Sequence, residues 1–167
     1  DPLTSVCVGA VTGDPAGFHT FEDVFEAFSA QLRHFFDIKI HANRAIERLY
    51  ATRMPAPFLS LLIDDCIAKG LDYNEGGARY NTTYIMPVGI GTVTDALSAI
   101  RHHVFEHEDV TMPDLLRALA RDFTGDEVMR QRLWNKTPRY GNDDAAADGL
   151  MRRVFEAVHT IVDGRPN

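Results

Sequence analysis

Apolar side chains recur at helical spacing over the first long patterned stretch of the chain. A hydroxyl at Thr20, with the carboxylate of Asp23 three residues on, has the arrangement of a capping box and predicts that a helix begins there. The stripe resumes near residue 46 and stops before Pro55, because proline disfavours the helical conformation of the residue before it. One apolar face is thus predicted, formed by Phe21, Val24, Phe25, Phe28, Leu32, Phe35, Phe36, Ile46, Leu49 and Tyr50.

The pattern after Pro57 predicts further helices and one strand. A helix over 58–69 ends at Gly70, and another follows over 92–106. Between them, the β-branched and aromatic residues of 79–85 favour a short strand flanked by glycine turns. The remaining helices are predicted at 112–123, 126–135 and 143–162, whereas residues 1–19 have no sustained period and are predicted as loop. The fold class is therefore mainly α with a short strand insert.

Composition narrows the class of protein. The 167 residues correspond to one ordinary domain, and a hydrophobic share of 45% allows a real core. With 17 basic and 24 acidic side chains, the net charge of −7 argues against a nucleic-acid partner. No apolar run approaches the roughly 20 residues of a membrane span. The two cysteines, Cys7 and Cys66, have no metal-ligand spacing, and a reduced, cytoplasmic setting is expected.

The segment His103-Val104-Phe105-Glu106-His107 fits the H-x-x-E-H pattern of a metallopeptidase helix. Two histidines four residues apart on a helix can share one metal ion, with the glutamate polarising its bound water. The alternative is the exposed end of an amphipathic helix, since Glu108 and Asp109 follow directly. No third ligand stands out downstream, so the metallopeptidase is the weaker interpretation and no metal site is predicted.

Two acidic runs are candidates for catalytic or metal-binding carboxylates. Asp64 and Asp65 fall inside the predicted helix 58–69, where adjacent side chains point about 100° apart and cannot converge on one ion. Asn142, Asp143 and Asp144 follow Gly141 at the start of the last predicted helix and are expected to cap it. The neighbouring carboxylates would suppress a thiolate at Cys66, which is therefore expected to be a small buried residue.

The run Gly76-Gly77-Ala78-Arg79-Tyr80-Asn81-Thr82 is the most informative local pattern. Paired glycines permit a sharp turn or a close backbone approach. The guanidinium of Arg79 after them offers a planar fork suited to a carboxylate or sulfonate. An ordinary turn in which Arg79 pairs with a surface carboxylate explains the same residues equally well.

Six short segments, which follow one another along nearly the whole chain, can be read as one pattern. They are Met54-Pro55-Ala56-Pro57-Phe58-Leu59-Ser60, Asp64-Asp65-Cys66-Ile67, Gly76-Gly77-Ala78-Arg79-Tyr80-Asn81, Val88-Gly89-Ile90-Gly91-Thr92-Val93-Thr94-Asp95, Asn135-Lys136-Thr137-Pro138-Arg139-Tyr140-Gly141-Asn142-Asp143-Asp144 and Asp163-Gly164-Arg165-Pro166-Asn167. Taken together, these segments resemble the glycyl radical enzymes of the pyruvate formate-lyase type.

The resemblance implies a parent enzyme with a ten-stranded α/β barrel wrapped in helices. In that parent a glycyl radical, installed by an activating enzyme that uses S-adenosylmethionine and an iron–sulfur cluster, oxidises a cysteine, and the thiyl radical abstracts hydrogen from substrate. The family patterns Gly-Cys-Val-Glu and Arg-Val-x-Gly-Tyr do not occur in this sequence. Residues 1–167 are therefore expected to be a single internal segment, with the cysteine loop upstream and the glycine loop downstream.

The expected function is that of a segment of a glycyl radical lyase, inactive on its own. The sequence after the double glycine resembles most closely that of isethionate sulfite-lyases and arylacetate decarboxylases. This resemblance implies cleavage of a C–S or C–C bond in a small anionic substrate. Arg79, Tyr80 and Asn81 are the predicted substrate-binding residues; no catalytic, cofactor-binding or metal residue is predicted in the chain. Expected partners are the rest of the parent polypeptide, the activating enzyme, the substrate and, as an option, a second copy in a homodimer. A non-catalytic helical binding or structural module derived from the family is the alternative.

Overall fold

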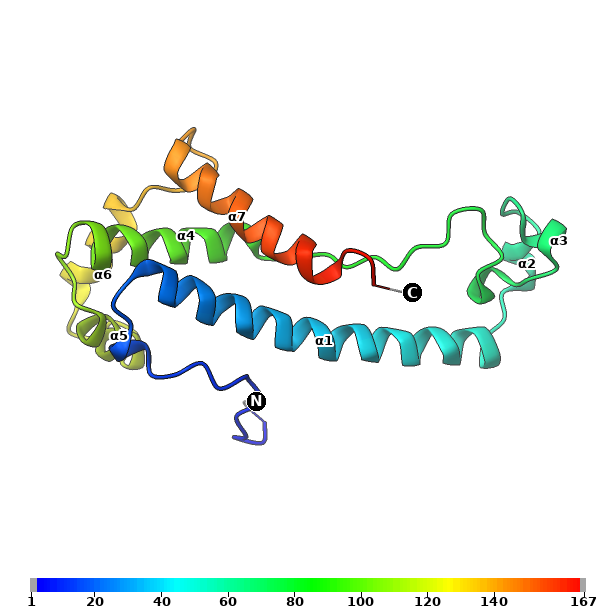
Figure 1. The fold of residues 1–167 in the computed structure, drawn as a ribbon, viewed down its shortest axis with the longest axis horizontal. Coiled ribbons are helices and arrows are strands. Elements are labelled where there is room, and N and C mark those ends of the chain that lie inside the picture. Colours follow the sequence, from blue (N-terminus) through cyan, green and yellow to red (C-terminus); the bar gives the residue numbers. More distant parts are fainter. Residues whose placement is uncertain (1–2, 166–167) are drawn as a thin grey trace. The chain divides into compact units, whose positions relative to one another are not determined.

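The computed structural model describes residues 3–165. Helices account for all its regular structure (Figure 1). The described residues form two compact units, and the long helix over 21–53 contributes to both. The first unit holds residues 3–34 and 87–163, and the second holds residues 35–86 and 164–165. In chain order the elements are η1 (Pro15–Gly17), α1 (Phe21–Arg53), α2 (Pro57–Ser60), α3 (Cys66–Lys69), η2 (Tyr73–Glu75), α4 (Ile90–Ile100), η3 (Arg101–Glu106), α5 (Met112–Ala120), α6 (Glu127–Lys136) and α7 (Ala145–Val162).

The core of the first unit forms where α4 and α7 lie side by side (Figure 1). Leu97 of α4 meets Leu150 and Val154 of α7, and Phe21 from the start of α1 completes the buried cluster. A second cluster lies around the start of α5 and contains Val110, Met112 and Leu115. Burial of these apolar side chains is the main favourable term for the first unit.

The second unit is held by turns. The carboxylate of Asp72 accepts hydrogen bonds from the backbone N–H groups of Ala56 and Asn74 and from the hydroxyl of Ser60, at 2.8–3.1 Å. The Ser60 hydroxyl also accepts the backbone N–H of Tyr73 at 2.8 Å. These bonds tie α2 to η2, two elements that are in contact.

The predicted start and end of the first helix are confirmed. The helix α1 begins at Phe21, and Thr20 and Asp23 bond reciprocally as a capping box: Thr20 Oγ1 accepts the Asp23 N–H at 3.2 Å, and Asp23 Oδ2 accepts the Thr20 N–H at 2.8 Å. The helix ends at Arg53, two residues before Pro55. At the other end of the chain Asp144 caps α7, as predicted, by accepting the N–H groups of Ala146 and Ala147.

The helix predicted over 58–69 is wrong as a continuous element. Only α2 and α3 are helical; residues 61–65 form turns between them, and Asp65, directly before α3, has a left-handed backbone with φ of 75°. Gly70 ends α3 with φ of 65°, as predicted, and Cys66 is 2% exposed, which confirms its expected burial.

The predicted strand over 79–85 is not formed either: residues 3–165 contain no strand, and this run is an irregular segment leading to α4. Tyr80 and Tyr84 are largely exposed in it. The helix predicted over 92–106 exists but starts at Ile90, and its last six residues form the π-helix η3. The helices α5, α6 and α7 lie where helices were predicted, with ends that differ by at most three residues.

Among the residues that the structure describes, no helix combines the length and the apolar character needed to cross a membrane.

Candidate functional site

The glycine pair before Arg79 makes a turn that no larger residue can copy. Gly76 has φ of 85°, a left-handed conformation that glycine tolerates best. A Cβ added at Gly77 would lie 2.3 Å from the carbonyl oxygen of Leu71 and 2.9 Å from that of Asp72. Gly76 is therefore required by its left-handed backbone, and Gly77 by a close approach of backbone to backbone within the second unit.

The turn positions Arg79 next to two carboxylates. Its Nε and Nη2 donate to Asp65 Oδ2 and Oδ1 at 3.0 and 2.8 Å, and its Nη1 lies 3.4 Å from Asp64 Oδ2. The hydrogen bond from Arg79 lowers the pKa of Asp65, and the same bond raises the pKa of Arg79. The structure thus shows the ion pair that was the alternative to an anion clamp.

The pairing also corrects the expectation that Asp64 and Asp65 diverge. That argument assumed a helix, whereas the left-handed backbone of Asp65 breaks it and lets both carboxylates reach the same guanidinium. The backbone N–H of Arg79 further donates to the Asp64 carbonyl at 3.1 Å.

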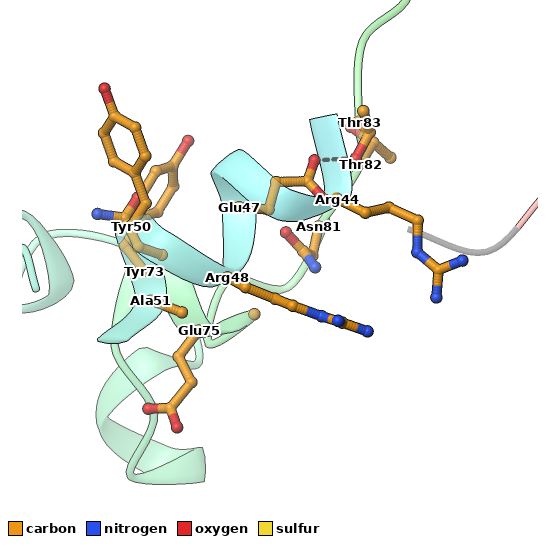
Figure 2. A pocket seen from close by; sticks show the side chains of 12 residues that line it. Arg44, Glu47, Arg48, Tyr50, Ala51, Tyr73, Glu75, Asn81, Thr82 and Thr83 are labelled. Atoms are coloured by element: carbon orange, nitrogen blue, oxygen red, sulfur yellow. Dashed lines mark hydrogen bonds between the residues drawn. The ribbon is translucent and has the colours of Figure 1, made fainter. Parts of the chain in front are cut away.

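The other two predicted site residues lie apart from this pair. Tyr80 is 86% exposed. Asn81 lines a polar pocket of about 440 Å³ between the second half of α1 and the segment 73–83, shown in Figure 2. Arg79, Tyr80 and Asn81 are adjacent in the sequence, but in the structure Arg79 contacts the carboxylates of Asp64 and Asp65, whereas Asn81 lines the pocket.

The pocket contains residues that sequence reasoning did not select. Arg44, Glu47 and Arg48 of α1 line it, opposite Asn81 and Thr83 (Figure 2). The hydroxyl of Thr83 donates a hydrogen bond to the Glu47 carboxylate, drawn as the dashed line. The available signal was the spacing of 44, 47 and 48, which places three charged side chains on one face of the predicted helix.

The structure does not bring together the two histidines of the H-x-x-E-H pattern, His103 and His107. His103 is 1% exposed, and its Nδ1 lies 2.9 Å from Asp109 Oδ1, so it belongs to the packed interior of the first unit. The residue that meets His107 is His102, with ring centroids 4.0 Å apart. His102, Glu106 and His107 each offer one ligand atom, and these atoms all lie within 4.8 Å of one another.

The pKa of His102 is lower than that of an ordinary surface imidazole. Burial lowers its pKa, and the neighbouring His107 and His103 lower it further, because each disfavours a second positive charge. The carboxylate of Glu106 opposes this shift. The Glu106 carboxylate is itself held by Arg101, whose Nε donates to Oε1 at 2.7 Å.

Comparison with known proteins identifies the class. A family model described as "Pyruvate formate lyase-like" matches residues 1–167. The chain therefore belongs to the pyruvate formate-lyase-like family of glycyl radical enzymes, which confirms the resemblance seen in the sequence.

Individual relatives refine the comparison. The chain is 49% identical over 166 residues to trans-4-hydroxy-L-proline dehydratase of Clostridioides difficile, covering 99% of this chain and 21% of that enzyme. It is 37% identical over 152 residues to the isethionate sulfite-lyase of Nitratidesulfovibrio vulgaris, covering 88% and 18%. The chain thus spans about a fifth of the length of these enzymes.

Solved structures agree with the sequence comparison. The crystal structure of the Clostridioides difficile hydroxyproline dehydratase with its substrate bound superposes with a TM-score of 0.94, covering 100% of this chain and 21% of that one. The glycerol-bound B12-independent glycerol dehydratase from Clostridium butyricum, at 30% identity, gives a TM-score of 0.90 and covers 98% and 21%. The fold described above is therefore that of a segment of a glycyl radical enzyme.

Proposed function

We propose that this chain is an internal segment of a glycyl radical lyase that acts on a small anionic substrate, and that it is inactive on its own. The observation that carries the proposal is the family match over the full 167 residues together with a coverage of only about a fifth of each enzyme compared. The expected cysteine and glycine loop patterns do not occur in the sequence, so the groups that make and use the radical belong to the rest of the parent polypeptide.

In the parent, the glycyl radical supplies hydrogen abstraction and is installed by a separate activating enzyme with S-adenosylmethionine and an iron–sulfur cluster. This segment contributes to the structure of the parent, because its helices wrap the ten-stranded barrel. It also contributes to substrate binding, because the turn at Gly76 and Gly77 positions Arg79 and the residues after it. The proposed substrate-binding residues are Arg79, Tyr80 and Asn81. To bind substrate, the Arg79 guanidinium exchanges the carboxylates of Asp64 and Asp65 for the substrate's anionic group.

The sequence identities to the named relatives favour an anionic substrate and also one type of bond cleavage. Hydroxyproline, named for the 49% identical relative, carries a carboxylate, and isethionate, named for the 37% identical relative, carries a sulfonate. The relative crystallised with uncharged glycerol is more distant, at 30%. The higher identity to a dehydratase supports elimination of water, that is C–O cleavage, ahead of C–S or C–C cleavage.

A segment exchange tests the proposal. The homologous fifth of the Clostridioides difficile dehydratase is replaced by residues 1–167, the chimera is activated, and dehydration of trans-4-hydroxy-L-proline is followed. We expect turnover within about tenfold of the parent, because 49% identity and a shared fold preserve the packing against the barrel. The isolated chain, treated with the same activating enzyme, should show no glycyl doublet in electron paramagnetic resonance.

Two results would contradict the proposal. A chimera that folds and acquires the glycyl radical but never turns over would favour the alternative, a helical binding or structural module that has lost its catalytic fit. A glycyl radical on the isolated chain would show that the segment is not inactive by itself.

A further inference from the structure

The last turns of the α4–η3 helix bring two histidines together in a way that the sequence pattern conceals. In an α-helix, residues five apart point about 140° away from each other. The segment Arg101–Glu106 is instead wound as a π-helix, and the backbone N–H of His107 donates to the carbonyl of His102 at 2.9 Å. This winding places the rings of His102 and His107 on the same face. Single π-turns within α-helices are rare and occur frequently at functional sites.

The tautomer of His107 is determined by its neighbour. Its Nδ1 lies 3.2 Å from the carbonyl oxygen of His102, and a carbonyl oxygen can only accept a hydrogen bond. The proton of the neutral ring is therefore on Nδ1, and the lone pair is on Nε2. An imidazole that donates one nitrogen to a backbone carbonyl and offers the other is the usual arrangement of a histidine metal ligand.

The carboxylate of Glu106 is oriented in a comparable way. Arg101 holds Oε1 at 2.7 Å, while Oε2 faces His102 Nδ1 at 3.7 Å, too far for a hydrogen bond. The second oxygen is thus directed at the histidines. Side-chain exposures of 21% for His102 and 43% for Glu106 leave a path from solvent.

We infer that His102, Glu106 and His107 form a binding site for one divalent zinc-class ion. Two imidazole nitrogens and one carboxylate oxygen are a known three-ligand zinc set, with a fourth position for water. Ligand atoms around a tetrahedral zinc lie about 3.3 Å apart, given bonds of about 2.0–2.1 Å. The present separations within 4.8 Å close to that value by side-chain rotation alone, because all three residues are partly or largely exposed.

The site differs from the H-x-x-E-H pattern, which would require His103. That ring is buried and paired with Asp109, so it cannot turn to the surface without breaking the interior of the first unit. Glu106 is here a ligand, not the residue that polarises water, so the inference carries no peptidase activity.

Zinc chloride titrated into the chain in a calorimeter tests the inference. We expect uptake of one equivalent and an affinity that falls at least tenfold in each of His102→Ala and His107→Ala, with a smaller loss in Glu106→Gln. Cobalt(II) substitution should give the visible absorption of a four-coordinate ion. The matched control is His159→Ala, which removes an exposed histidine on α7 of the same unit and should leave the affinity unchanged.

Circular dichroism verifies that each variant keeps its helices, and the exposed position of His107 keeps the test valid if His102→Ala disturbs the fold. The absence of saturable uptake by the folded wild-type chain would overturn the inference. So would an affinity that is indifferent to both His102→Ala and His107→Ala, or one that is lost in His159→Ala.

Discussion

Arg79 grips Asp65 with two hydrogen bonds, Nε to Oδ2 at 3.0 Å and Nη2 to Oδ1 at 2.8 Å, in the parallel geometry that a guanidinium and a carboxylate favour. The same arginine is bonded through its backbone N–H to the carbonyl of Asp64. Side chain and main chain therefore tie the end of the glycine turn to the residues just before α3.

The turn itself gives the first prediction. Gly77→Ala should destabilise the chain by about 2 kcal/mol or more, because the new Cβ would lie 2.3 Å from the carbonyl oxygen of Leu71 and backbone must move. Hydrogen exchange of the amides around the turn and the thermal midpoint by circular dichroism both report the loss.

Gly149→Ala is the matched control for that substitution. Gly149 lies within α7, and a Cβ added there would have nothing within 4 Å of it, so the extra methyl group meets no obstacle. Alanine is favoured over glycine inside a helix, and the control should raise stability by up to about 1 kcal/mol. Equal destabilisation by both substitutions would contradict the close-approach explanation.

Asp72 predicts a pH dependence. The N–H of Ala56, and then those of Asn74 and Tyr73 with the hydroxyl of Ser60, lower the pKa of its carboxyl in the folded chain. A depressed carboxyl pKa stabilises the fold above the unfolded pKa of about 3.9, and this contribution disappears as the pH falls through the lower, folded pKa.

Asp72→Asn should therefore lower the thermal midpoint at pH 7, and its difference from wild type should shrink as the pH falls below about 4. Thermal melts from acidic to neutral pH measure this, with Glu156→Gln on the exposed surface of α7 as control. A difference that stays constant over the whole range would show that Asp72 acts through its shape and not its charge.

Leu150 tests the core of the first unit. It is 2% exposed and packs with Phe21, Leu97 and Val154. Leu150→Ala should cost about 2–5 kcal/mol, the range for truncating a buried leucine, whereas Leu119→Ala, at a side chain that is 54% exposed, should cost far less. Chemical denaturation of both variants measures the loss in the free energy of unfolding. Similar losses in the two variants would show that this cluster is not the core of the first unit.

Helices whose signals are local were predictable from the sequence. The capping box at Thr20, the stop at Pro55 and the cap at Asp144 are each determined by a few neighbouring residues, and the structure forms all three. The family could also be inferred, because short segments in order along the whole chain carry it.

Features that depend on backbone irregularity could not be predicted. Aspartate tolerates a left-handed backbone better than most residues, but its presence does not indicate that Asp65 adopts one. The turn over 61–65, which includes this angle, interrupts the predicted helix and brings two carboxylates to Arg79. Likewise, the change from α to π winding after Ile100 moves the partner of His107 from residue 103 to residue 102. A periodicity of 3.6 residues cannot reveal either change.

The role of Arg79 is tested by comparing both ends of its ion pair in the activated chimera of this segment with the hydroxyproline dehydratase. If Arg79 binds the substrate's anion, Arg79→Lys should lower kcat/KM on the order of tenfold or more, because lysine cannot reproduce the two parallel hydrogen bonds. Asp65→Asn should then leave kcat/KM unchanged or raise it, because a competing carboxylate has been removed from the guanidinium. Radical content, measured by electron paramagnetic resonance, should be equal in all variants.

A purely structural ion pair between Arg79 and Asp65 predicts the opposite pattern. Arg79→Lys and Asp65→Asn would then lower the thermal midpoint together by a similar small amount, as the loss of a surface pair does, while the folded enzyme keeps normal kinetics. The two explanations therefore separate on kcat/KM and not on stability alone, since only substrate binding makes the two substitutions act in different directions. Parallel losses of stability with unchanged turnover would remove Arg79 from the proposed substrate site.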